Sequence, residues 1–221
     1  MFKLKLFAAG ALCLAGLQTA SAQEVSGNIT LATDYVFRGV SQTDHGTAIQ
    51  GGFDVGSDSV YAGAWGTNVD FGDGTNTELD FYAGYTPSAG GFDFDFGGIL
   101  YAYPGSPDTA GEQDFLEAFA GISRGYGSFD WDAKLSWSPD FYLESGPAWY
   151  AEFGASYQLA ENFAVDAHLG LSRFDDLPGD DYEDYQIGAS TTQFGVDWDL
   201  RWYDSQLDEG FVLSVSQSFG G

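Results

Sequence analysis

Acidic side chains recur at alternate positions in several short segments of this chain, and they are the residues whose type and spacing could do chemistry. The clearest segment is 129–137, whose odd positions carry rings and aliphatic groups. Its even positions are polar and include Asp130, Asp132 and Lys134. Because an extended strand sends successive side chains to opposite faces, carboxylates at this spacing share one face. A face lined with carboxylates attracts cations and repels anions at close range.

The polar faces of the expected strands carry many carboxylates and few basic groups. The acids assigned to these faces are Asp34, Asp54, Glu78, Asp80, Asp93, Asp95, Glu117, Asp130, Asp132, Glu152, Asp166, Asp184, Asp197 and Asp199. The basic residues there are Arg38, Lys134 and Arg201. A dry interior would bury many unneutralised carboxylates at a large desolvation cost. The charge balance therefore predicts a wet interior, with these residues as pore-lining candidates.

Asp34 and Arg38 are predicted on the polar face of the first strand, four positions apart. That spacing is about 13 Å along a strand, too far for a direct ion pair. Arg38 could be a lone cation that narrows or filters an acidic lumen. It could also form a structural ion pair with a neighbouring strand, for example with Asp54.

The elements that must position these side chains are a series of short strands. We expect them near 28–38, 47–55, 60–70, 77–85, 92–102, 114–124, 127–137, 149–158, 163–174, 183–191, 193–203 and 209–219. Most have the 9–11 residues that a tilted strand needs to cross a bilayer. Connectors alternate between long and short, and all prolines fall in connectors. This pattern predicts an all-β fold, an antiparallel transmembrane β-barrel of about twelve strands, with short periplasmic turns and longer extracellular loops.

Residue faces follow from the same alternation. Glu117 must avoid lipid, which places Phe119 inside as well and Leu116 outside. Aromatic residues at the ends of outward rows would form interfacial girdles, although aromatics are also simply favourable in strands. The girdle candidates are Tyr35, Phe37, Tyr85, Trp149, Tyr157, Trp202 and Phe219.

The N-terminus has the features of a cleaved signal peptide over residues 1–22. Lys3 and Lys5 precede an apolar run that is too short to span a bilayer, and Ala20-Ser21-Ala22 forms an A-x-A cleavage site. Residues 23–221 then form a single barrel domain. Cys13 lies within the leader, so the mature chain would have no thiol chemistry.

Composition disfavours several classes of function. The net charge of −26 disfavours nucleic acid as a partner, because such binding needs positive surface. His45 and His168 lack a recognisable nucleophile motif, so we expect no enzyme, no cofactor and no dedicated metal site. The acidic loop 175–184 could hold Ca²⁺ loosely through oxygen ligands, or it could be a solvated loop.

Two stretches of the chain resemble a known family. Residues 33–43, TDYVFRGVSQT, resemble the SDYxFRGxSQT signature of the bacterial TorF-like proteins, a family of proposed porins. Residues 50–54, 67–71 and 78–85 look like its following blocks, so the match is specific over residues 28–85. The resemblance implies an outer-membrane location and a porin label, and it transfers no site residues. Gly220-Gly221 after Phe219 departs from the usual aromatic C-terminus of such barrels.

The sequence therefore predicts a passive outer-membrane channel that prefers cations, with membrane lipid and small solutes or cations as its partners. Twelve strands leave a narrow lumen, which the inward tyrosines Tyr82, Tyr101, Tyr103 and Tyr150 could occlude. Two alternatives stay open. One is a non-conducting barrel with a loop-binding or structural role, and the other is a soluble secreted β-protein that binds a ligand in its cavity.

Overall fold

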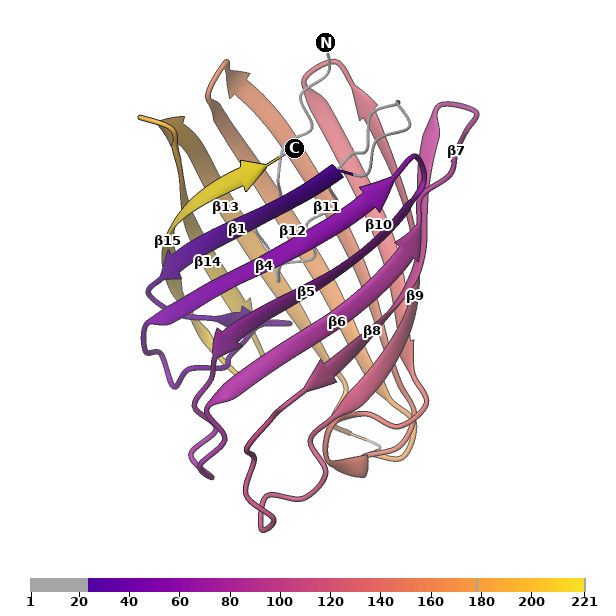
Figure 1. The fold of residues 1–221 in the computed structure, drawn as a ribbon, viewed down its shortest axis with the longest axis vertical. Helices are drawn as coiled ribbons and strands as arrows, with labels where there is room; N and C mark the ends of the chain where they lie inside the picture. Colours follow the sequence, from indigo (N-terminus) through magenta and orange to yellow (C-terminus); the bar gives the residue numbers. More distant parts are fainter. Residues whose placement is uncertain (1–23, 178, 221) are drawn as a thin grey trace.

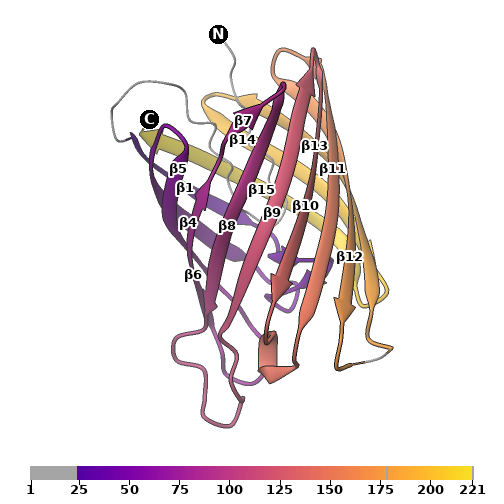
Figure 2. The ribbon, with the colours of Figure 1, turned by 90° about the vertical axis from the view of Figure 1, so that its right-hand side faces the viewer.

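A computed structural model describes residues 24–177 and 179–220, which form a closed antiparallel β-barrel (Figures 1 and 2). Its long strands are β1 (Glu24–Ala32), β4 (Ala48–Ser57), β5 (Val60–Asn68), β6 (Thr77–Tyr85), β8 (Phe92–Ala102), β9 (Phe115–Tyr126), β10 (Phe129–Ser138), β11 (Ala148–Ala160), β12 (Phe163–Phe174), β13 (Tyr182–Gln193), β14 (Val196–Ser205) and β15 (Glu209–Gly220). Each pairs with its neighbours in the chain, and β1 pairs with β15 to close the barrel. The predicted twelve-stranded fold is confirmed.

The two faces of the barrel wall follow the alternation in the sequence. Along β6, Glu78, Asp80 and Tyr82 are buried, whereas Leu79 and Phe81 are exposed on the outside. In β9 the prediction from charge is also confirmed, because Glu117 and Phe119 are buried and Leu116 is exposed. The outer surface is thus apolar, and the interior carries the polar and charged side chains.

Connections at the two ends of the barrel differ in length, as predicted. β1 begins and β15 ends at one end, where short turns such as residues 127–128 also lie (Figure 1). The connections over residues 103–114 and 139–147 project from the opposite end (Figure 2). The second of these contains the short 3-10 helix η1 (Tyr142–Glu144). No helix in the described part of the chain is long and apolar enough to cross a membrane.

The first strand ends earlier than predicted. It stops at Ala32, and the chain then forms a small hairpin from β2 (Val36–Phe37) and β3 (Val40–Ser41). Its turn residues Arg38 and Gly39 have φ angles of 49° and 74°. Two positive φ values at the centre of a two-residue turn are the geometry that best matches strand twist in tight hairpins. The predicted placement of Asp34 and Arg38 on the face of the first strand is therefore wrong.

The same correction applies to two of the predicted girdle aromatics. Tyr35 is buried and packs on Trp65 inside the barrel, with ring centroids 5.4 Å apart. Phe37 packs against Tyr101, 5.7 Å between centroids. The two rings are two positions apart, as the prediction required, but both pack on the inner wall of the barrel instead of facing lipid.

An aromatic cluster fills one side of the interior. The hairpin contributes Tyr35 and Phe37, and the wall contributes buried rings from β5, β6, β8 and β9. The wall rings are Trp65, Tyr82, Tyr101, Phe115 and Phe119. The wall from β12 to β15 presents mainly polar and charged side chains to the interior, among them Ser172, Asp184, Gln186, Asp199 and Arg201. The remaining element, β7 (Ser88–Ala89), pairs with the start of β8. The predicted leader, residues 1–22, lies outside the described residues.

Candidate functional site

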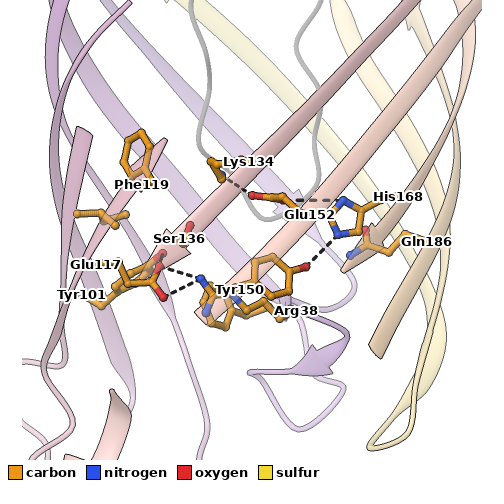
Figure 3. Close-up of a pocket in the computed structure, with 12 residues that line it drawn as sticks. Arg38, Tyr101, Glu117, Phe119, Lys134, Ser136, Tyr150, Glu152, His168 and Gln186 are labelled. Atoms are coloured by element: carbon orange, nitrogen blue, oxygen red, sulfur yellow. Dashed lines mark hydrogen bonds and ion pairs between the residues drawn. The ribbon is translucent and has the colours of Figure 1, made fainter. Parts of the chain in front are cut away.

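Arg38 holds the tip of the β2–β3 hairpin against the wall strand β9. Its Nη2 donates to both carboxylate oxygens of Glu117, at 2.8 and 2.7 Å. The guanidinium also lies 4.2 Å from the ring centroid of Tyr150 and 4.6 Å from that of Phe37. Figure 3 shows this group directed at Glu117 within the barrel. Arg38 therefore forms a structural ion pair, as one of the two interpretations expected, but with Glu117 of β9 rather than Asp54.

Further hydrogen bonds attach both arms of the hairpin to the barrel wall. The Tyr35 hydroxyl donates to Glu78 Oε1 at 2.9 Å, which anchors the first arm to β6. The backbone N–H of Ser41 donates to Asp208 Oδ2 at 2.8 Å, and the Ser205 hydroxyl donates to the Gly39 carbonyl at 2.8 Å. These bonds anchor the second arm to β14 and to the connection that follows it. The hairpin thus bridges two sides of the barrel and narrows the interior.

Asp34 organises the connection around the hairpin. Its Oδ1 accepts from the hydroxyls of Ser41 and Thr43, both at 2.7 Å. His45 Nδ1 lies 3.3 Å from Asp34 Oδ2, and His45 Nε2 lies 3.6 Å from Asp208 Oδ1. Asp34 is a buried anchor of this connection, not a group on the strand face.

A pocket lies beside the hairpin tip, in the middle of the barrel (Figure 3). Its lining residues come from the hairpin and from β8 to β13: Phe37, Arg38, Ile99, Tyr101, Glu117, Phe119, Lys134, Ser136, Tyr150, Glu152, His168 and Gln186. One side of this pocket is apolar, and the other is polar with paired charges. We refer to these residues together as the constriction pocket.

A hydrogen-bonded network runs across the polar side of the constriction pocket. Lys134 Nζ lies 2.6 Å from Glu152 Oε1, across the β10–β11 pair where the two residues stand in register. His168 Nδ1 lies 3.9 Å from Glu152 Oε2, and His168 Nε2 lies 2.9 Å from the Tyr150 hydroxyl. That hydroxyl also donates to Asp184 Oδ2 at 3.0 Å. The network fixes the orientation of the charged groups that face the pocket.

A second charge cluster lies on the polar wall. Arg201 Nη1 is 2.7 Å from Asp166 Oδ2, and its Nη2 is 3.2 Å from Asp199 Oδ2. Arg38, Lys134 and Arg201, the predicted interior cations, are therefore all engaged with carboxylates. Several other acids accept bonds from neutral hydroxyls instead, as Asp54 does from Tyr82 at 2.6 Å.

Apart from Asp34 and Arg38, the predicted pore-lining residues are on barrel strands, and pairing register puts them on the interior side. They are Asp54, Glu78, Asp80, Asp93, Asp95, Glu117, Asp130, Asp132, Lys134, Glu152, Asp166, Asp197, Asp199 and Arg201. The constriction pocket brings together Arg38, Glu117, Lys134 and Glu152. Asp93 and Asp130 are exposed towards the short-turn end instead. That any of these residues lines a conducting path stays a prediction.

The sequence pointed to Tyr101 and Tyr150 as inward groups that could occlude the lumen, but it did not point to Gln186 or to the hairpin in this pocket. Alternation predicts that Tyr150 faces inward, but its partners lie on other strands and on the hairpin. Arg38-Gly39 between Val36-Phe37 and Val40-Ser41 was the available signal for the turn, and it is weaker than Asn-Gly or Asp-Gly.

At the long-loop end, hydrogen bonds link three connections over the aromatic side of the barrel, those over residues 69–76, 103–114 and 139–147. The Thr75 hydroxyl donates to Gln113 Oε1 at 2.7 Å, and Gln113 Nε2 donates to Asp73 Oδ2 and to the Tyr142 hydroxyl. The backbone N–H of Thr75, followed by side-chain bonds from Thr75 and Gln113, lowers the pKa of the Asp73 carboxyl. Burial raises the pKa of Tyr142. These bonds close part of that end of the barrel.

Metal binding has no preformed site in the described ranges. Within residues 24–177 and 179–220, no group of three or more His, Cys, Asp or Glu residues is arranged to hold a metal ion. The acidic loop 175–184 forms an ion pair instead, between Arg173 Nε and Asp181 Oδ2 at 3.6 Å.

Solved structures similar to this chain are outer-membrane porins and channels. The KdgM porin has a TM-score of 0.66 and 7% sequence identity, over 88% of this chain and 99% of its own. The NanC porin has a TM-score of 0.56 and 8% identity, over 90% and 100% of the two chains. An outer-membrane channel from Pseudomonas putida F1 has a TM-score of 0.56 and 11% identity, over 96% and 100%. At these identities the likeness shows the fold.

Sequence comparison adds one family. The model of a family described as "Bacterial protein of unknown function (Gcw_chp)" matches residues 17–218. No curated protein matches the chain. The KdgM porin has also been solved in complex with disordered oligogalacturonate.

Proposed function

Because this chain belongs to the Gcw_chp family of bacterial proteins of unknown function, its activity has to be inferred from its geometry, and we propose that it is an outer-membrane channel for small hydrophilic solutes that prefers cations. The TorF-like label predicted from residues 33–43 is not confirmed by the family match. The porin-like fold of the similar structures supports a channel of this kind.

A membrane location is supported by the outer surface of the barrel. Apolar side chains such as Phe53, Phe81, Leu135 and Ile187 are exposed around the wall, on β4, β6, β10 and β13. A contiguous apolar surface of this kind is unfavourable in water and favourable in lipid. This observation disfavours the soluble secreted alternative. The predicted leader would provide the export route, and the alternating long and short connections suit an outer membrane.

Cation preference is supported by the balance of charge inside the barrel. Inward-facing carboxylates outnumber the inward-facing basic groups, and Arg38, Lys134 and Arg201 are each paired with an acid. Paired cations contribute little net positive potential, so the unpaired carboxylates set the sign of the field in the lumen. This excess of interior carboxylate is the observation that carries the proposal. An acidic interior repels a polyanion, so oligogalacturonate, which is bound in a structure of the KdgM porin, is not the solute we propose for this chain.

A non-conducting barrel with a structural or loop-binding role remains the second candidate. The β2–β3 hairpin and the aromatic cluster occupy one side of the interior, and the Gln113 network covers the same side at one end. A barrel filled in this way could serve as a scaffold for its loops.

Single-channel recording tests both candidates. Refolded mature protein, residues 23–221, is inserted into a planar bilayer under a KCl gradient. We expect discrete current steps with a cation-selective reversal potential. Anion-selective steps would contradict the assignment of the interior charge. Silence from a barrel that shows a heat-modifiable gel shift would favour the non-conducting scaffold.

A further inference from the structure

We propose that the constriction pocket is a binding subsite for a small zwitterionic solute with an apolar side chain, such as a free α-amino acid. This inference rests on the proposed channel function and adds a solute class to it. Lys134 takes the solute carboxylate, Glu152 takes its ammonium group, and the apolar wall takes its side chain.

Charge balance singles out this pocket within an acidic interior. Its lining carries two basic side chains, Arg38 and Lys134, and two carboxylates, Glu117 and Glu152. Elsewhere in the interior, carboxylates are in excess. A lining that offers groups of both signs can accept a carboxylate and an ammonium group together, so it suits a solute that carries both.

Accessibility separates the two ion pairs. Arg38 and Glu117 have side chains that are 9% and 3% exposed, and both are committed to holding the hairpin. Lys134 and Glu152 have side chains that are 26% and 17% exposed. The ammonium group of Lys134 has three donors, so it can keep Glu152 and still donate to a solute carboxylate. The Lys134–Glu152 pair is therefore the one that a solute can reach.

An apolar surface borders the Lys134–Glu152 pair in the same pocket. Ile99 of β8 and Phe119 of β9 are buried and form the apolar side of the pocket. Lys134 Nζ lies 5.8 Å from the ring centroid of Phe119. That distance is a cation–π contact, so the ammonium group of Lys134 and the ring of Phe119 border the same part of the pocket. Ser136 and Gln186 line the same pocket and add neutral polar contacts.

Calorimetric titration of the refolded, detergent-solubilised barrel tests the inference. Probes are leucine, leucinamide, which is a cation, and 4-methylpentanoate, which is an anion of the same shape. We expect saturable binding of leucine, with each singly charged analogue weaker by about tenfold, because one charge-assisted hydrogen bond is lost. Equal binding of leucinamide and leucine, or no binding of leucine, would overturn the proposal.

Variants assign the binding to the proposed pair. Lys134→Met should weaken leucine binding by about tenfold, whereas leucinamide, which has no carboxylate and competes with Lys134 for Glu152, should bind no more weakly than to wild type. Arg173→Met, which removes an exposed cation of β12, is the matched control and should leave both unchanged. The double variant Lys134→Glu with Glu152→Lys restores the pair in reverse and should recover leucine binding. Leucine binding unaffected by Lys134→Met in a barrel with a normal heat-modifiable gel shift would refute the assignment.

Bilayer recording on the same preparations separates this inference from the channel proposal. Cation-selective steps without leucine binding would refute the zwitterion subsite and leave the channel standing. Leucine binding without current steps would refute the channel, and with it the solute pathway. Steps that leucine reduces in wild type but not in Lys134→Met support both.

Discussion

Arg38 holds the β2–β3 hairpin in place through contacts on several sides of its guanidinium. Its guanidinium is enclosed by Glu117, Tyr150 and Phe37, and it links the hairpin to the wall. A buried ion pair adds little stability relative to a well-packed apolar pair, but removing one partner leaves an uncompensated buried charge. The residue is therefore expected to matter more for where the hairpin lies than for net attraction.

Arg38→Met should destabilise the barrel and widen its interior. Glu117 would be left buried without its partner, at a cost of about 3–5 kcal/mol in the free energy of unfolding. We expect a lower urea midpoint by heat-modifiable gel shift and a larger single-channel conductance. Arg173→Met is the control, because its ion pair with Asp181 is exposed and such pairs contribute about 0–1 kcal/mol. Equal midpoints for the two variants would contradict this account.

Side-chain faces were largely predictable from sequence, and long-range partners were not. The inward placement of Glu117 and Phe119 followed from one constraint, that a carboxylate avoids lipid. The placement of Asp34 and Arg38 failed because the apolar row of odd positions in the first strand continues to Phe37, in the first arm of the hairpin, so period alone cannot tell a wall strand from an inserted one. The partner of Arg38 lies 79 positions away, and no local pattern encodes that pairing.

At the scale of elements, neighbouring strands fit together through glycine and aromatic pairs. Across β5 and β6, Tyr61 stands opposite Gly84, and Gly63 stands opposite Tyr82. A Cβ placed on either glycine would collide with the facing ring. The rings thus lie flat over the glycine positions, a device that stabilises glycine within sheets. These pairs account for part of the high glycine content on the crowded, aromatic side of the barrel.

Gly84→Ala should destabilise the β5–β6 pair by displacing the Tyr61 ring. Overpacking of this kind costs about 1–3 kcal/mol in the free energy of unfolding. Gly121→Ala is the matched control, because a Cβ there would meet its nearest atom at 3.6 Å, an ordinary contact. Urea unfolding monitored by the gel shift should separate the two. A Gly121→Ala variant as unstable as Gly84→Ala would show that the ring contact is not the cause.

The β2–β3 hairpin should act as a constriction that can be removed. Replacing residues 36–41 with a flexible Gly-Ser linker removes the Arg38–Glu117 pair and the Phe37–Tyr101 contact. The barrel wall does not include these residues, so we expect it to fold and to conduct with larger steps. A Gly-Ser replacement of residues 106–111, in the connection between β8 and β9, is the control and should leave the step size closer to wild type. Unchanged steps in the hairpin variant would place the narrowest point elsewhere.

At the scale of the molecule, the interior is asymmetric around its circumference. The hairpin and the rings of β5, β6, β8 and β9 pack one side. Small polar groups such as Thr30, Gln50 and Ser216 face the interior on the other side, where register places them side by side across β15, β1 and β4. Solutes would therefore pass along the polar wall and meet the constriction pocket near the middle.

Selectivity should depend on salt, because some interior carboxylates, such as those of Asp130 and Asp132, are exposed or half-buried and act on ions through water. The screening length is about 10 Å at 0.1 M and about 3 Å at 1 M ionic strength, so the carboxylates act on passing ions more weakly as KCl rises. We expect the cation preference in the reversal potential to decline between these concentrations.

Asp130→Asn with Asp132→Asn, which neutralises carboxylates of β10, should reduce the preference mainly at low salt. Glu144→Gln, in the connection between β10 and β11, is the control and should change it less. A preference unaffected by salt and by the β10 substitutions would mean that selectivity arises from close contacts at the constriction rather than from the field of the acidic wall.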